Sequence, residues 1–257
     1  MSIALVTGAS SGIGAVYARR LAARGHDLVL VARATDRMNA LAAELRRTHG
    51  VTIDVLTADL TDDAQLASVT NRLRGDPPVD ILVNNAGAAV PGGFLAAEAE
   101  RLDQLLRLNV RAPTLLAQAV VGGMVARGHG AIINVGSVLG LLPEYSPGIY
   151  SATKAYVQVL SQSLATEVSG KNIQVQAVLP AATRTEIYDR AGGDINAVRN
   201  VMEVEALVDA ALVGFDRKEL VTIPAVPDEA TWTAFEQARL TLAGGFSNAE
   251  PGARYRA

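Results

Sequence analysis

The residues best suited to chemistry are Tyr150 and Lys154, four positions apart in a chain of 257 residues that uses lysine only three times. On an α-helix, positions i and i+4 share a face, so the ammonium would lie beside the phenol. A positive charge there favours the phenolate and would lower the phenol pKa from about 10, so that the phenol can exchange a proton with an alcohol or ketone. The alternative interpretation is a surface pair that stabilises the helix by about a few tenths of a kcal/mol.

A glycine-rich turn follows the first predicted strand, with Gly8, Gly12 and Gly14 in segment 7–14. Glycines let the backbone approach a pyrophosphate, and the N-terminus of the helix that follows attracts an anion. The pattern predicts a dinucleotide site, although its G-x-x-x-G-x-G spacing differs from the common G-x-G-x-x-G fingerprint. The alternative is a turn that only packs the strand against the helix. A P-loop is excluded because no Gly-Lys-Ser/Thr follows.

Arg33 follows the second predicted strand, and Arg37 lies close behind it. An acidic residue at this place would bind the ribose hydroxyls of NAD, whereas an arginine accommodates the 2′-phosphate of NADP. The sequence therefore predicts NADP(H) in preference to NAD(H). Asp36 weakens this prediction slightly, and the alternative is that Arg33 is an ordinary solvated loop residue.

Short β-branched runs alternate with longer helical patterns along the chain. The runs at 3–7, 27–32, 52–57, 81–84, 131–135, 175–179 and 219–223 predict strands, and the patterns at 13–24, 37–48, 64–74, 97–125 and 150–168 predict helices. This alternation predicts a three-layer, doubly wound α/β Rossmann fold, with a seven-stranded, mostly parallel sheet in one domain of residues 1–257. We expect a substrate lid at about 183–200 and a C-terminal extension at about 226–257.

Composition excludes several classes of function. The net charge of −3 provides no basic surface for nucleic acid or an anionic membrane, and no apolar stretch is long enough to span a bilayer. The chain has no cysteine, and its three histidines are scattered, so we expect neither disulfides nor a metal site. The chain begins with a strand pattern and not with a signal peptide, which predicts a cytoplasmic protein.

Together, the segments Thr-Gly-Ala-Ser-Ser-Gly-Ile-Gly at 7–14 and Asn-Asn-Ala-Gly at 84–87, with Asn109, Ser137, Tyr150 and Lys154, resemble the short-chain dehydrogenase/reductase family as far as about residue 185. The resemblance implies that Ser137 holds the substrate oxygen, Tyr150 exchanges its proton, and Lys154 stabilises the phenolate and binds the nicotinamide ribose. It also implies that Asn109 kinks its helix and completes a proton relay. Ser137 follows a predicted parallel strand, at the sheet edge where ligands bind. The alternatives are a core amide for Asn109 and a strand-end cap for Ser137.

The same resemblance implies the residues that bind the cofactor. Asp59 would contact the adenine, with helix capping as the alternative, and Thr185, or otherwise Thr183, would contact the nicotinamide amide. Ala181 stands where the family usually has glycine. The expected cofactor-binding residues are Gly8, Ser10, Ser11, Gly12, Ile13, Gly14, Arg33, Asp59, Leu60, Asn85, Ala86, Gly87, Tyr150, Lys154, Pro180, Thr183 and Thr185.

Apolar residues are expected to surround the Tyr150 hydroxyl. They predict a small-molecule ketone or aldehyde with an apolar body as substrate. With the chemistry that the resemblance implies, we expect an NADP(H)-dependent carbonyl reductase that interconverts carbonyl and alcohol. A serine hydrolase is disfavoured because Ser137 lacks the G-x-S-x-G pattern. The remaining alternative is a non-catalytic protein that binds nicotinamide dinucleotides as a sensor. The resemblance also implies a homodimer or homotetramer. The expected pocket walls are Val90, Leu139, Leu141, Leu142, Tyr145, Ile187 and Tyr188.

Overall fold

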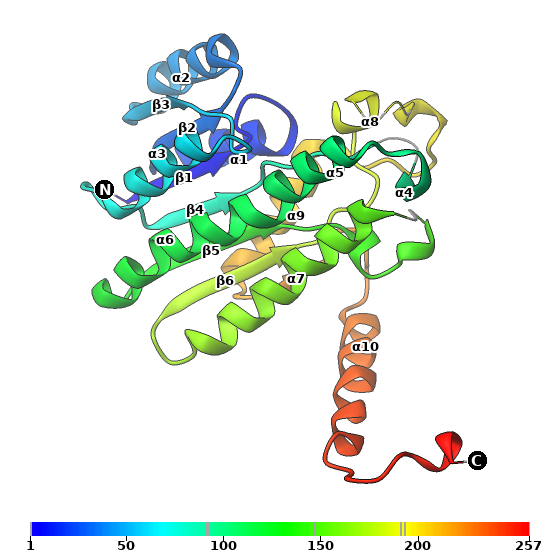
Figure 1. Cartoon of the computed structure of the whole chain (residues 1–257). Helices are drawn as coiled ribbons and strands as arrows, with labels where there is room; N and C mark the ends of the chain where they lie inside the picture. The colour runs from blue at the N-terminus through cyan, green and yellow to red at the C-terminus, as the bar shows by residue number, and fades with distance from the viewer. Residues whose placement is uncertain (1, 91–92, 146–147, 191, 193, 257) are drawn as a thin grey trace. The chain divides into compact units, whose positions relative to one another are not determined.

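A computed structural model describes residues 2–90, 93–145, 148–190, 192 and 194–256 (Figure 1). Contacts within the chain divide it into two units, residues 1–224 and 225–257. Each unit is described by itself. The division of the chain into one domain with a C-terminal extension stays a prediction.

The first unit is built on seven parallel strands in the order β3-β2-β1-β4-β5-β6-β7. The predicted fold class is confirmed, and the strand ends differ from the predicted ones by at most two residues. The shortest strand, β7, keeps only residues 221 and 222 of its predicted run. The strands are Ile3–Thr7 (β1), Asp27–Ala32 (β2), Ile53–Thr57 (β3), Ile81–Asn84 (β4), Gly130–Val135 (β5), Ile173–Val178 (β6) and Val221–Thr222 (β7).

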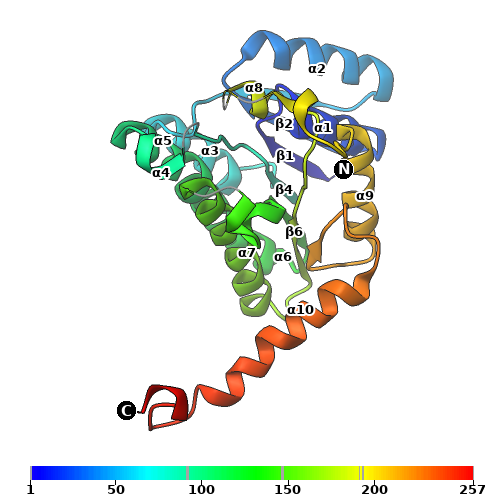
Figure 2. The same cartoon turned by 90° about the vertical axis from the view of Figure 1, so that its right-hand side faces the viewer.

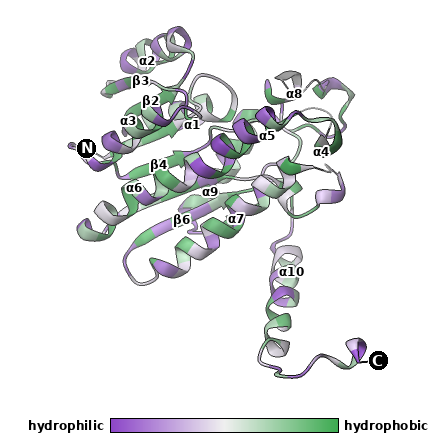
Figure 3. Cartoon of the chain, in the orientation of Figure 1, coloured by the Kyte–Doolittle hydropathy of each residue, from purple (hydrophilic) through white to green (hydrophobic). Residues whose placement is uncertain are grey.

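Helices cover both faces of this sheet (Figures 1 and 2). Because side chains alternate along a strand, Ala4 and Val6 of β1 pack in one core and Leu5 packs in the other. The first core includes residues of α1, α2 and α9, and the second includes residues of α3 and α6, with Leu164 of α7 packed against it. Figure 3 shows hydrophobic residues along β4 and hydrophilic ones over much of α2, as expected for a buried strand and a covering helix.

The helices of the first unit connect successive strands or line the sheet edge that carries the site. Their bounds are Gly12–Ala23 (α1), Thr35–His49 (α2), Asp63–Arg74 (α3), Gly93–Ala96 (α4), Ala99–Leu106 (α5), Ala112–Arg127 (α6), Ile149–Glu167 (α7), Ile187–Arg190 (α8) and Val204–Asp216 (α9). Short 3₁₀ turns lie at Val138–Gly140, Pro143–Tyr145 and Ile195–Ala197.

The segment predicted as one helix over 97–125 is helical from Ala99 to Arg127, with a π-helical turn around Asn109 in its middle. Helix α5 ends at Leu106, a π-helical turn covers Arg107–Arg111, and α6 begins at Ala112. Asn109 lies in the middle of the π turn, and its side-chain amide bonds to the backbone of Ala88. A π turn widens the helix locally and occurs often at functional sites, and here it lets a buried polar side chain reach a neighbouring loop.

The second unit contains α10, Glu229–Thr241, followed by 3₁₀ turns at Leu242–Gly245 and Ala253–Tyr255. The Asp228 side chain caps α10 by accepting a hydrogen bond from the Ala230 amide at 2.8 Å. Trp232 and Phe235 stack with their ring centroids 5.3 Å apart. No residue of α10 is buried. In the part of the chain that the structure describes, none of the helices combines the length and the apolar character of a membrane span.

Candidate active site

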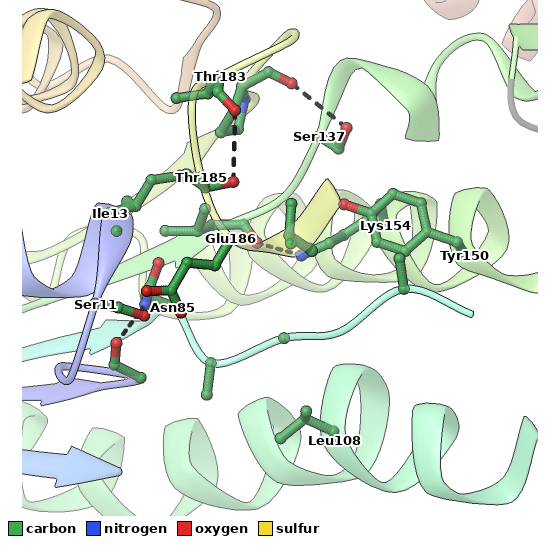
Figure 4. A pocket seen from close by; sticks show the side chains of 18 of the residues that line it. Ser11, Ile13, Asn85, Leu108, Ser137, Tyr150, Lys154, Thr183, Thr185 and Glu186 are labelled. Atoms are coloured by element: carbon green, nitrogen blue, oxygen red, sulfur yellow. Dashed lines mark hydrogen bonds between the residues drawn. The ribbon is translucent and has the colours of Figure 1, made fainter. Parts of the chain in front are cut away.

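A cavity of about 1040 Å³ opens at the carboxyl ends of the strands (Figure 4). Strand β1 pairs with β2 on one side and with β4 on the other. Strands β2 and β3 extend the sheet in one direction from β1, and β4 to β7 extend it in the opposite direction, so the strand order reverses here. In open α/β sheets, ligands bind at this switch point. Every predicted cofactor-binding residue except Gly14 lines the cavity, as do three of the four predicted catalytic residues; Asn109 lies behind the wall.

The glycine loop is packed too closely for side chains. A Cβ on Gly8 would lie 2.7 Å from Asn85 Nδ2, and one on Gly14 would lie 2.3 Å from Gly8 O. Gly8 also has a φ of 66°, which favours glycine. The side-chain amide of Asn85 donates to Thr7 O at 2.9 Å and so holds the end of β4 against the loop.

The N-terminus of α1 faces this loop without a side-chain cap. Ser11 occupies the N-cap position, and its side chain makes no capping hydrogen bond. The first amides of a helix have no partners within the helix, and they carry its positive dipole end. The loop and helix together therefore form a cradle that can accept a diphosphate.

Two arginines stand at the outer end of the cavity, and each faces a carboxylate. Arg33 Nη1 lies 3.6 Å from Asp59 Oδ2, and Arg37 Nη1 lies 2.9 Å from Glu186 Oε1. Burial alone would raise the pKa of Asp59, but hydrogen bonds from Thr61 and the charge of Arg33 outweigh it and hold that pKa below its usual range.

The hydrogen bonds around Asp59 show which residue caps helix α3. Asp59 Oδ1 accepts hydrogen bonds from the amide and the hydroxyl of Thr61, at 2.9 and 2.8 Å. The N-cap of α3 is Asp62, whose side chain accepts from the Gln65 amide. Asp59 therefore shapes the turn before the helix and still lines the cavity.

Tyr150 and Lys154 share one face of α7, as their spacing predicts, and both face the cavity (Figure 4). Lys154 Nζ lies 5.7 Å from the centroid of the Tyr150 ring and donates to Val135 O at 3.0 Å. The ammonium is therefore held at the end of β5, and the surface-pair interpretation is wrong because Lys154 is buried.

Burial sets the titration of this pair. It raises the pKa of Tyr150 to about 12; hydrogen bonding with Ser137 lowers it, and the nearby Tyr188 phenol raises it further. Burial also lowers the pKa of Lys154 to about 8. The pKa of the phenol therefore lies above its usual value in this structure, and not below it as predicted, because burial removes the hydration of the charged form.

Ser137 and Asn109 complete the group. Ser137 lies just beyond β5, where its hydroxyl is hydrogen-bonded to Tyr150 and donates to Pro180 O at 3.4 Å. Asn109 donates to Ala88 O at 2.9 Å and to Thr153 Oγ1 at 3.1 Å. A Cβ on Gly87 would lie 3.4 Å from both Asn109 Oδ1 and Lys154 Nζ, so both polar groups lie beside this glycine.

The segment after β6 closes one side of the cavity. Thr183 forms a β-bridge with Met202, and a Cβ on Gly12 would lie 3.4 Å from Thr185 Cγ2. Both threonines line the cavity. Which of them contacts the nicotinamide amide, Thr185 or otherwise Thr183, stays a prediction. The expected lid at 183–200 includes Ala191 and Gly193, which lie outside the described residues.

A family model described as short chain dehydrogenase matches residues 2–195. The chain belongs to the short-chain dehydrogenase family. One similar solved structure is a short-chain dehydrogenase from Sphingobium yanoikuyae in complex with NADPH, which is 55% identical, with full coverage of both chains and a TM-score of 0.97.

Two further relatives of this short-chain dehydrogenase differ in how much of them the chain covers. The bulky-bulky ketone specific alcohol dehydrogenase from Comamonas testosteroni is 50% identical, with 100% of this chain and 99% of that chain covered and a TM-score of 0.92. The 17-beta-hydroxysteroid dehydrogenase type 3 of Homo sapiens is 34% identical over 71% of this chain, and the match spans only 59% of that relative's length.

The predicted substrate walls of this short-chain dehydrogenase are mostly in place. Leu141 does not line the cavity, because it follows the 3₁₀ turn that places Leu139 at the wall. Sequence reasoning missed Leu108 and Glu186 as cavity residues and Thr153 as the partner of Asn109. Leu108 and Thr153 were within reach of a sequence argument, since Leu108 directly precedes Asn109 and Thr153 directly precedes Lys154. The remaining predicted walls, Val90, Leu139, Leu142, Tyr145, Ile187 and Tyr188, line the cavity.

Proposed function

We propose that this chain is an NADP(H)-dependent oxidoreductase that interconverts a carbonyl compound and an alcohol, with Tyr150 as general acid and base. The observation that carries the proposal is the Tyr150 phenol, bonded to Ser137, in the same cavity as the glycine loop. A diphosphate cradle and a proton-exchanging group in one cavity are the two parts that hydride chemistry on a carbonyl requires.

The residues of the cradle fit a dinucleotide. Gly8 and Gly14 leave the loop backbone bare, and the N-terminus of α1 is open to an anion. Arg33 and Arg37 at the outer end suit a 2′-phosphate, and the relative from Sphingobium yanoikuyae is a complex with NADPH. When bound there, the nicotinamide would supply or accept the hydride.

Tyr150 and the side chains around it then transfer one proton to or from the substrate oxygen. Ser137 holds the substrate oxygen by hydrogen bonding, and the Tyr150 hydroxyl donates its proton to that oxygen as the carbonyl is reduced. A phenol with a pKa of about 12 is protonated at neutral pH, which favours the direction of reduction. Lys154, with a pKa of about 8, can return a proton to the phenolate. Asn109 is the remaining member of the proposed proton relay, and its side-chain amide donates to Ala88 O in the neighbouring loop.

The lining of the cavity supports a ketone with an apolar body as the substrate. Leu139, Leu142 and Ile187 stand with Tyr188 around the catalytic end. Burial of apolar surface is the main source of affinity such walls offer. The relative from Comamonas testosteroni, named for bulky-bulky ketones, points to a carbonyl flanked by two large groups. Aldehydes stay within the proposed class.

A panel of ketones and aldehydes with NADPH and with NADH, followed by nicotinamide absorbance, tests this function. We expect NADPH oxidation, fastest with ketones that carry two bulky groups. Tight NADPH binding without turnover would favour the nicotinamide-sensing alternative. Equal or faster turnover with NADH would overturn the cofactor preference alone.

We further propose a homodimer or homotetramer. Helix α7 carries exposed apolar side chains outside the cavity, including Val159, which is 62% exposed, and Tyr156. Such a surface is typical of one that associates. Sedimentation that gave a stable monomer at working concentration would reject this proposal. The cytoplasmic location stays a prediction.

A further inference from the structure

The ion pair between Arg37 and Glu186 joins two sides of the cofactor end of the cavity. Arg37 lies in the first turns of α2, whereas Glu186 follows Thr185 in the segment after β6. Both line the cavity, and Figure 4 shows the Glu186 side chain extending into it. Both carboxylate oxygens of Glu186 accept from Arg37 Nη1, at 2.9 and 3.2 Å.

Each arginine at this end of the cavity faces a carboxylate, so positive and negative charges balance there. A site for a 2′-phosphate would not require these carboxylates. Arg33 faces Asp59, and Arg37 faces Glu186. A phosphate that reached Arg37 would approach a carboxylate already bound to the same guanidinium, and like charges so close repel. A ribose without the phosphate adds no charge there.

The two carboxylates differ in the contacts that they make. Asp59 is fixed by two hydrogen bonds from Thr61. The Glu186 side chain is 44% exposed and Arg37 is 57% exposed, and ion pairs with such exposure are weak. The contact between Arg37 and Glu186 is therefore one with which an incoming phosphate can compete.

We propose that Glu186 is a specificity-determining residue for the cofactor: its carboxylate occupies Arg37 in the free protein, and the 2′-phosphate of NADPH must displace it. Glu186 thereby lowers the affinity for NADPH and leaves that for NADH unchanged. The inference rests on the proposed NADP(H) preference and adds a residue that limits it.

The test is direct binding of NADPH and NADH, by fluorescence titration, to the wild type and to Glu186→Gln. The substitution keeps the size of the side chain and removes its charge. We expect the Kd for NADPH to fall about two- to fivefold, the range that corresponds to an exposed ion pair, with no change for NADH. Adenosine 2′,5′-bisphosphate should also bind more tightly to the variant, since it carries the phosphate without the nicotinamide.

Glu44→Gln is the matched control. Glu44 lies on the same helix as Arg37 and forms a similar exposed pair with Arg19, but neither residue of that pair lines the cavity. This variant should bind both cofactors as the wild type does. In an Arg37→Gln background, Glu186→Gln should no longer tighten NADPH binding, because the two residues act through one contact.

Weaker or unchanged NADPH binding by Glu186→Gln would overturn the inference, and so would equal tightening for NADH. The melting temperature of each variant, measured in parallel, separates loss of fold from loss of contact. Because binding is measured without turnover, the expected shift in a protein that reduces no ketone would leave this inference standing and overturn only the proposed catalysis.

Discussion

The side-chain amide of Asn109 donates to the hydroxyl of Thr153 at 3.1 Å, and that hydroxyl donates in turn to Tyr150 O at 2.7 Å. These two hydrogen bonds join the π turn between α5 and α6 to the first turn of α7. This buried contact therefore links Asn109 to the helix that carries Tyr150 and Lys154.

Replacing Thr153 with valine tests this contact. Valine keeps the shape but removes the hydroxyl, so the Asn109 amide loses a buried partner. We expect a loss of about 1–2 kcal/mol in the free energy of unfolding and a several-fold fall in kcat. Urea denaturation and turnover measure the two effects. Thr166→Val is the control, because Thr166 lies on the same helix with one exposed bond to Gln162 O; equal losses in both variants would contradict the prediction.

Removal of the Tyr150 hydroxyl should separate activity from stability. Tyr150→Phe takes away the proposed proton donor and its bond to Ser137 but keeps the ring. We expect turnover to fall by about a hundredfold or more, with little change in the melting temperature. Tyr156→Phe removes a phenol bonded to Thr114 on the outer side of the same helix and should stay active. A Tyr150→Phe protein with most of its activity would refute the mechanism.

A methyl group at Gly14 should damage the cofactor cradle. Its Cβ would lie 2.3 Å from Gly8 O, which is backbone that must move. We expect Gly14→Ala to lose about 1–3 kcal/mol of stability and to bind NADPH at least tenfold more weakly. Gly122→Ala on α6 meets nothing within 4 Å and should be neutral or stabilising. Denaturation curves and NADPH titration of both variants measure the difference; tight NADPH binding by Gly14→Ala would contradict it.

The buried Lys154 should make stability depend on pH. Its pKa lies near 8 in the folded state and at 10.5 when unfolded, so the unfolded chain binds more protons between these values. Lys154 therefore contributes stability that increases as the pH rises from about 8 toward 10, on the order of 2–3 kcal/mol. Above pH 10 the raised pKa of Tyr150 acts in the opposite sense, since the unfolded phenol ionises first.

Urea midpoints of the wild type and of Lys154→Met, measured from pH 7 to 10, test this dependence. The wild-type midpoint should rise relative to that of the methionine variant as the pH passes 8. Parallel curves for the two proteins would show that Lys154 titrates at the same pH folded and unfolded.

Features that depend on neighbours in the sequence could be predicted well. The runs at Asp27–Ala32 and Ile81–Asn84 have the ends that their β-branched residues predicted. The glycines at 8 and 14 fall where a side chain would collide, and the i, i+4 spacing placed Tyr150 and Lys154 on one face. In each case, the residue type limits the local backbone directly.

Only the tertiary structure decided the contacts between distant segments. The side chain of Asn109, in the π turn, finds its hydrogen-bond partners in a separate loop and a separate helix. Glu186 forms an ion pair with Arg37, which is 149 positions away in the sequence. The pKa of Tyr150 rises although Lys154 lies close, because burial in the folded protein removes the water that would surround the phenol on an isolated helix. Residue types and spacing thus determined the fold and the kinds of group at the site, whereas packing decided which groups touch and how they titrate.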